Sequence, residues 1–109
     1  MKTIGLIGGM SWESSLEYYR IINEQVKKNL GVSHSAKSLM YSVDFEEIKL
    51  LQHEGNWDKA TQIMVDAAKR LEKGGADFVV ICTNTMHKMA DQMQSQIQIP
   101  ILHIVDATA

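Results

Sequence analysis

Short apolar runs alternate with helix-like stripes along this chain, and the alternation limits the fold more than any other feature. Four runs have the character of buried strands: 3–7, 38–43, 76–81 and 101–105. Between them, apolar residues recur every three or four positions, as in helices that cover a sheet. Strands that alternate with helices predict a parallel sheet, and right-handed crossovers place the helices on its faces. The sequence therefore predicts an α/β fold with a parallel four-stranded sheet flanked by helices.

The predicted helices are defined by three apolar stripes. The first consists of Leu16, Tyr19, Ile22, Val26 and Leu30. The second consists of Trp57, Ala60, Met64, Ala67, Ala68 and Leu71, and the third of Met86, Met89, Ala90, Met93 and Ile97. We expect each stripe to pack against the sheet, and the methionines of the third stripe to be core residues.

Capping signals predict where these helices begin and end. Ser14 and Glu17 have the spacing of a capping box at the start of the first helix, and Gly31 suits its end. Asp44 predicts the start of a short helical segment. The pair 74–75, two glycines, predicts the end of the second long helix.

Charge and cysteine content exclude several classes of function. Eleven Lys and Arg against 13 Asp and Glu give a formal charge of −2, which argues against a dedicated nucleic-acid-binding protein. No apolar run reaches the roughly 18 residues of a membrane span, and the start of the chain has no signal-peptide pattern. The single cysteine cannot form an intramolecular disulfide, and the histidines lack metal-ligand spacing. We expect a cytoplasmic protein without a metal, nucleic-acid or membrane partner.

The last residues bear on domain organisation. Residues 106–109 follow the fourth predicted strand like an N-cap and one helical turn, and a single turn is not stable alone. We therefore expect residues 1–109 to be the N-terminal α/β domain of a longer protein, with a frayed natural C-terminus as the alternative. An apolar surface left uncovered tends to find a partner, so we expect a homodimer or higher oligomer. The alternatives for Trp12 are a place in the pocket lining and a contact with a partner half, and Tyr18 and Trp57 are possible interface residues.

Ligands of parallel α/β sheets bind beyond the carboxyl ends of the strands, so the segments that follow the strands are the candidate site. Gly8 and Gly9 begin a turn into a helix N-terminus, whose free N–H groups favour a carboxylate or phosphate. The dinucleotide and P-loop patterns are absent, and a steric need for glycine explains this turn more simply. After the third strand, Asn84 and Thr85 are good capping residues that can hold an anion. Helix capping beside a buried thiol explains them equally well.

Three motifs at strand ends resemble the aspartate/glutamate racemase family. They are Gly8-Gly9-Met10-Ser11, Asn84-Thr85-Met86-His87 and Ile99-Pro100-Ile101-Leu102-His103-Ile104. The resemblance implies one of two pseudo-symmetric α/β halves, with the active site between them. It also implies racemisation without a cofactor, neither pyridoxal nor a metal. One cysteine thiolate removes the α-proton, and a cysteine thiol of the other half returns a proton from the opposite face.

The chain departs from the family at the catalytic position, because the usual Cys-Asn-Thr-x-His motif places Thr83 where the cysteine is expected. Alternation along an extended strand supports this register. One face receives Phe78, Val80 and Cys82, and the other receives Val79, Ile81 and Thr83. Thr83 is therefore the predicted catalytic residue if Asn84 and Thr85 mark the site. Cys82 is the alternative if the strand bends locally.

A threonine hydroxyl is a far weaker acid than a thiol, whose ordinary pKa is about 8.5. Thr83 is therefore predicted to donate a hydrogen bond or relay a proton, and not to act as an unassisted base. A Thr/Cys pair is asymmetric, so we expect the enzyme to racemise far better in one direction.

The resemblance also implies a set of substrate-binding residues. Met10, through its amide, and Ser11, Asn84 and Thr85 are predicted to bind carboxylate, and Gln52 is predicted to contact the side-chain carboxylate. The expected ligand is a small acidic amino acid or a dicarboxylate. We expect these 109 residues to bind it weakly without turnover. The alternatives are a hydantoin racemase, a maleate isomerase or a decarboxylase of the same superfamily, or a non-catalytic dicarboxylate-binding α/β module.

Overall fold

The computed structural model describes residues 1–9, 12–82 and 87–102, without the side chains of 87 and 88. Its strands are β1 (Ile4–Gly8), β2 (Ser38–Ser42), β3 (Phe78–Ile81) and β4 (Ile101–Leu102). Its helices are α1 (Trp12–Leu30), α2 (Phe45–His53), α3 (Trp57–Lys73) and α4 (His87–Gln96). The strands form one parallel sheet in the order β2-β1-β3-β4. The predicted α/β fold with a parallel four-stranded sheet is confirmed.

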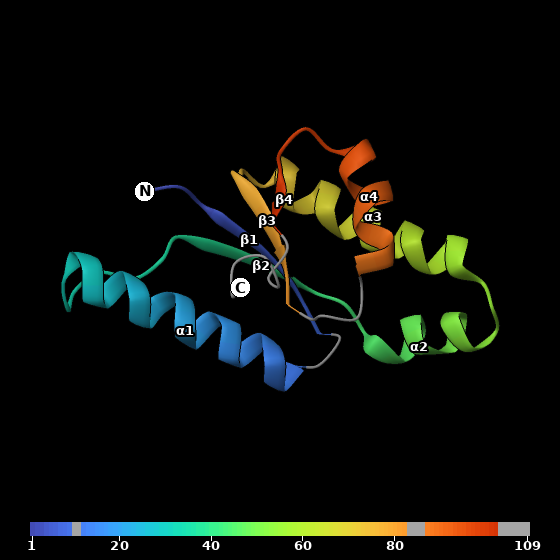
Figure 1. Cartoon of the computed structure of the whole chain (residues 1–109), viewed down its shortest axis with the longest axis horizontal. Helices are drawn as coiled ribbons and strands as arrows, with labels where there is room; N and C mark the ends of the chain where they lie inside the picture. Colours follow the sequence, from blue (N-terminus) through green and yellow to red (C-terminus); the bar gives the residue numbers. More distant parts are fainter. Residues whose placement is uncertain (10–11, 83–86, 103–109) are drawn as a thin grey trace.

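Helices cover both faces of this sheet, and Figure 1 shows α1 on one side with α3 and α4 on the other. The face beneath α1 has a small cluster of buried residues, Leu6, Val80 and Cys82. The opposite face has Ile7, Val79 and Ile81 in the main core, together with residues of α2, α3 and α4. Side chains on β1 and β3 therefore alternate between the two faces, as the period-two pattern predicts.

Helix α3 contributes most to the main core. Its buried residues are Ala60, Thr61, Met64, Val65, Ala67, Ala68 and Leu71. Asn56 caps its start, where the side-chain oxygen accepts a hydrogen bond from the Lys59 amide at 3.3 Å. The predicted stripe is confirmed except at Trp57, which is exposed at the first turn. The predicted end is also confirmed, because the helix ends before Gly74 and Gly75 takes a positive φ of +103°.

Helix α1 contacts the sheet through a stripe that keeps only part of the predicted one, since Ile22 and Val26 are half-buried but Leu30 is exposed. Ser15 is buried, and Tyr18 and Ile22 pack against the small cluster, whereas Leu16 and Tyr19 are exposed. The capping-box prediction is also wrong, since the helix begins at Trp12. The orientation of α1 follows from its close approach to β1, where a Cβ on Gly8 would lie 2.7 Å from Ser15 Oγ. Only a small side chain fits there, so the helix is turned and part of its apolar stripe faces outward.

Candidate functional site

The central strands β1 and β3 lie side by side, and the chain leaves them toward opposite sides of the sheet. From β1 it passes through α1 to β2, and from β2 through α2 and α3 to β3 on the far side of β1. Ligands of open α/β sheets bind at such a reversal of strand order, beyond the carboxyl ends. Most predicted site residues follow these two strand ends in sequence but lie outside the described residues: Met10, Ser11, Thr83, Asn84 and Thr85.

Three helices begin at this same edge of the sheet, because α1 follows β1, α2 follows β2 and α4 follows β3. N-terminal helix amides carry partial positive charge, so the edge favours carboxylates. Asp44 already occupies the start of α2, where its side chain accepts a hydrogen bond from the Glu46 amide at 3.1 Å. This confirms the predicted cap. Among the described residues, no group of three or more His, Cys, Asp and Glu is placed to hold a metal ion.

The turn after β1 is held tightly in place. The Gly8 carbonyl accepts a hydrogen bond from the Val43 amide at 2.9 Å, and the Gly9 amide donates to Ser15 Oγ at 3.1 Å. Gly9 has a φ of +94°, and a Cβ there would lie 2.1 Å from the Val43 carbonyl oxygen. The steric need for glycine is therefore confirmed at Gly9. Ser15 is a positioning residue that sequence reasoning missed, because it belongs to none of the predicted apolar stripes.

Cys82 is fully buried at the end of β3, and its amide donates a hydrogen bond to the Ile7 carbonyl at 3.0 Å. Its side chain lies on the α1 face with Leu6 and Val80, and Tyr18 packs against this cluster. Burial raises the pKa of the Cys82 thiol to about 12. Burial also raises the pKa of Tyr18, and the charge of an ionised Cys82 raises it further. At neutral pH this thiol is uncharged, and a neutral thiol is not the reactive form.

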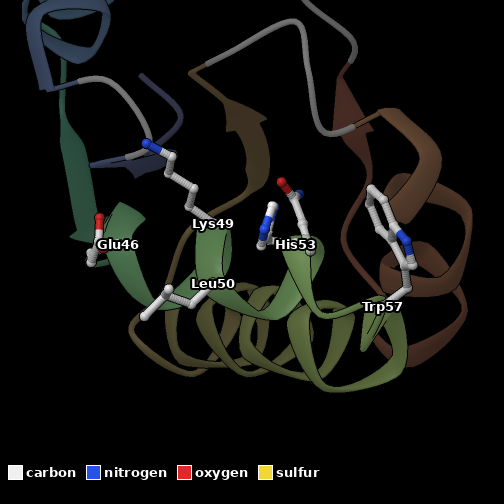
Figure 2. Close-up of a pocket in the computed structure, with 6 residues that line it drawn as sticks. Glu46, Lys49, Leu50, His53 and Trp57 are labelled. Atoms are coloured by element: carbon white, nitrogen blue, oxygen red, sulfur yellow. The ribbon is translucent and has the colours of Figure 1, made fainter.

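Gln52 is the only predicted binding residue in the described part of the chain. It is half-buried on α2 and lines a hollow of about 500 Å³. The other residues that line this α2 hollow are Glu46, Lys49, Leu50, His53 and Trp57. Figure 2 shows Lys49, His53 and Trp57 projecting to the same side. Sequence reasoning missed Lys49 and His53, although their i, i+4 spacing on a helix places them on one face. The hollow combines basic, amide and aromatic groups beside one carboxylate.

No described helix is long and apolar enough to cross a bilayer.

The family model described as Asp/Glu/Hydantoin racemase matches residues 7–109. The chain belongs to this family. The family match confirms the resemblance seen in the strand-end motifs.

Two relatives match nearly the whole of this chain. The broad specificity amino-acid racemase RacX of Bacillus subtilis (strain 168) is 28% identical over 110 residues, which cover 96% of this chain and 47% of RacX. The crystal structure of a Yersinia pestis protein assigned as an Asp/Glu racemase is 56% identical, with a TM-score of 0.95. That match covers 99% of this chain and 47% of the other.

A third racemase-family relative is more distant. The crystal structure of an aspartate racemase homologue from Pyrococcus horikoshii OT3 is 34% identical with a TM-score of 0.88, covering 98% of this chain and 46% of that one. The chain therefore spans about half the length of the relatives it matches. This coverage fits the prediction that it corresponds to one half of such a protein.

Proposed function

We propose that the chain is the N-terminal half of an amino-acid racemase that acts on aspartate, glutamate or a similar acidic amino acid. The reaction uses neither pyridoxal nor a metal and takes place in the cytoplasm. The observation that carries the proposal is the pairing of β1 with β3 at the reversal of strand order. The racemase-type residues follow these two strands, and helices that favour anions begin at the same edge.

The substrate is held by its carboxylates. Ser11, Asn84, Thr85 and the Met10 amide bind the α-carboxylate, and neutralising it stabilises the charge that develops when Cα loses its proton. Gln52 contacts the carboxylate of the substrate side chain. Its place in the α2 hollow, beside basic side chains, supports this assignment.

Thr83 is the acid/base residue of this half. A thiolate from the second half removes the Cα proton, and the electron pair is delocalised into the α-carboxylate. The Thr83 hydroxyl then passes a proton to the opposite face of Cα and regains one from solvent. The complete burial of Cys82 in the cluster beneath α1 supports Thr83 over its neighbour, because a fully enclosed side chain does not contact a substrate.

The Thr/Cys asymmetry has a thermodynamic limit. Two enantiomers have the same free energy, so kcat/KM for complete racemisation is equal in both directions. The directional preference expected from the sequence is therefore restricted to kcat and KM taken separately. It also appears in deuterium exchange, where the enantiomer whose proton faces the cysteine exchanges at Cα faster than it inverts.

Succinate binding by the 109-residue chain tests the ligand part of this proposal. We expect the NMR amide signals of Gly8, Gly9 and Cys82 to shift on titration. Asn84→Ala is expected to weaken binding roughly tenfold through loss of a carboxylate contact worth about 1.4 kcal/mol. The matched control is Asn29→Ala in the exposed last turn of α1, which leaves binding unchanged. Unshifted amides in the wild type would overturn the proposal.

The catalytic part is tested in a protein that carries the second half. Circular dichroism follows racemisation of aspartate and glutamate, and we expect turnover there but none by the 109 residues alone. Thr83→Cys is expected to equalise exchange and inversion for the two enantiomers. Succinate binding without Cα exchange would favour the non-catalytic binding module, and turnover of hydantoins alone would favour the hydantoin racemase alternative.

A further inference from the structure

A second hollow lies between the N-terminal parts of α3 and α4. Its volume is about 310 Å³, and sites for small molecules typically measure about 300–1,000 Å³. We call it the α3/α4 hollow, and the residues that line it are Trp57, Asp58, Thr61, Met89 and Gln92. Trp57 also lines the α2 hollow, so the two hollows have one aromatic side chain in common.

Thr61 is the residue that indicates a ligand for this hollow. It is only 8% exposed, and its hydroxyl has no hydrogen-bond partner within the described part of the chain. A buried hydroxyl without a partner destabilises a fold, so such groups are nearly always paired with protein, water or a ligand. Because Thr61 lines the α3/α4 hollow, we expect its partner to be a molecule that enters there.

The groups around Thr61 favour a positively charged ligand. Among the described residues that line the hollow, Asp58 alone is charged. The indole ring of Trp57 is 43% exposed, and the face of an indole attracts ammonium groups. Gln92 has an amide oxygen that accepts hydrogen bonds, and the buried Met89 gives the hollow an apolar wall. This combination of groups is suited to an organic cation.

We propose that the α3/α4 hollow binds a small primary ammonium ion that carries a short apolar tail. Such an ion has three N–H donors, which match the three oxygen-bearing side chains Asp58, Thr61 and Gln92. The ammonium group lies against the Trp57 ring, and the tail packs against Met89. This inference does not depend on the proposed function, because the dicarboxylate proposed there has the opposite charge and binds through other residues.

Butylammonium is the probe, and NMR of the isotopically labelled 109-residue chain measures its binding. We expect the indole N–H of Trp57, the backbone amide of Thr61 and the side-chain amide of Gln92 to shift with saturation. Butyrate, which has the opposite charge, and butanol, which has none, are expected to leave these signals in place. The comparison separates recognition of the ammonium group from simple burial of the apolar tail.

Variants of the hollow test which side chains hold the ammonium group. Asp58→Asn and Trp57→Leu are each expected to weaken binding about three- to fivefold, because each removes one partly exposed contact of the cation. The matched control is Asp91→Asn, which removes an exposed carboxylate of α4 that lies outside the hollow and leaves binding unchanged. Circular dichroism shows whether each variant remains folded.

Thr61→Val tests the buried hydroxyl with two measurements. Valine keeps the branched shape without the hydroxyl, so butylammonium binding is expected to weaken at least roughly tenfold. In the absence of the probe, the free energy of unfolding measured in urea is not expected to fall, because the hydroxyl that is removed has no partner. Thr61→Ser keeps the hydroxyl and is expected to retain binding. A lower stability of Thr61→Val would show that the hydroxyl is already paired, and would overturn the proposal.

Other results would also overturn it: no saturable shift with butylammonium, equal shifts with butanol, or equal losses in Asp91→Asn. Loss of butylammonium binding in a protein that carries the second half would mean that this half covers the hollow, and the proposal would fail. Succinate binding without butylammonium binding would overturn this inference and leave the proposed function standing. Butylammonium binding without succinate binding would do the reverse.

Discussion

The two faces of the sheet are covered by helices of similar length that are buried to very different extents. On one face, the 17-residue helix α3 buries seven side chains. On the other, the 19-residue helix α1 buries only Ser15 completely. The comparison indicates that most packing energy comes from the α3 face. The α1 face instead positions the turn after β1, encloses the Cys82 thiol and leaves apolar side chains exposed.

The largest expected effect is on the α3 face. Met64 is completely buried against the main core, so Met64→Ala is expected to lower the free energy of unfolding by about 2–5 kcal/mol. Ile21→Ala, at an exposed position on α1, is expected to change it by no more than about 0.5 kcal/mol. Urea denaturation followed by circular dichroism measures both. Equal losses in the two variants would contradict the unequal division of packing between the faces.

An intermediate effect comes from the thiol beneath α1. The unfolded chain ionises Cys82 near its ordinary pKa of about 8.5, whereas the folded chain does so at about 12. The unfolded state therefore releases its proton first. The stability that this thiol contributes is full below about pH 8.5 and is lost as the pH rises toward about 12. The loss is at most about 1.4 kcal/mol for each pH unit.

The matched variant for this prediction is Cys82→Ala, compared with wild type by urea denaturation at a series of pH values. Other titrating groups are common to both proteins, so the difference between the curves reports Cys82 together with its effect on the pKa of Tyr18. We expect the wild type to lose stability faster with rising pH. Two parallel curves would mean that the thiol is hydrated in the folded chain, and the α1 face would then be looser than described.

The smallest expected effect concerns the buried serine of α1. Ser15→Ala removes the acceptor of the Gly9 amide hydrogen bond, and we expect a loss of about 1 kcal/mol in the free energy of unfolding. The Gly9 amide should also exchange faster with deuterium, as NMR can measure. Unchanged exchange at Gly9 would show that the turn is held by the Val43 contact without help from α1.

The order of elements could be predicted from sequence because periodicity records it directly. The apolar run of β3 and the stripe of α3 each have one arrangement that buries them. The orientation of α1 could not be predicted, since Ile22 continues a helix-spaced stripe from Leu16 and Tyr19 as well as from Ser15 and Tyr18. The choice depends on the space beside Gly8, which belongs to a different segment of the chain.

The candidate site, like the fold, could be predicted only in part from the sequence. Strand alternation correctly placed Cys82 on the same face of β3 as Phe78 and Val80. Its raised pKa depends on complete burial beneath Tyr18, which alternation does not specify. The position of Gln52 in a hollow with Lys49 and His53 depends on how α2 meets the start of α3.

Because the Cys82 thiol is enclosed, its reactivity reports opening of the structure around it. Cys82 is the single cysteine of the sequence, and reagents in solution cannot reach it while α1 is in place. A sulfur that is fully covered resists both air oxidation and alkylation. Disulfide-linked species therefore form only when α1 separates from the sheet, by local opening or by global unfolding.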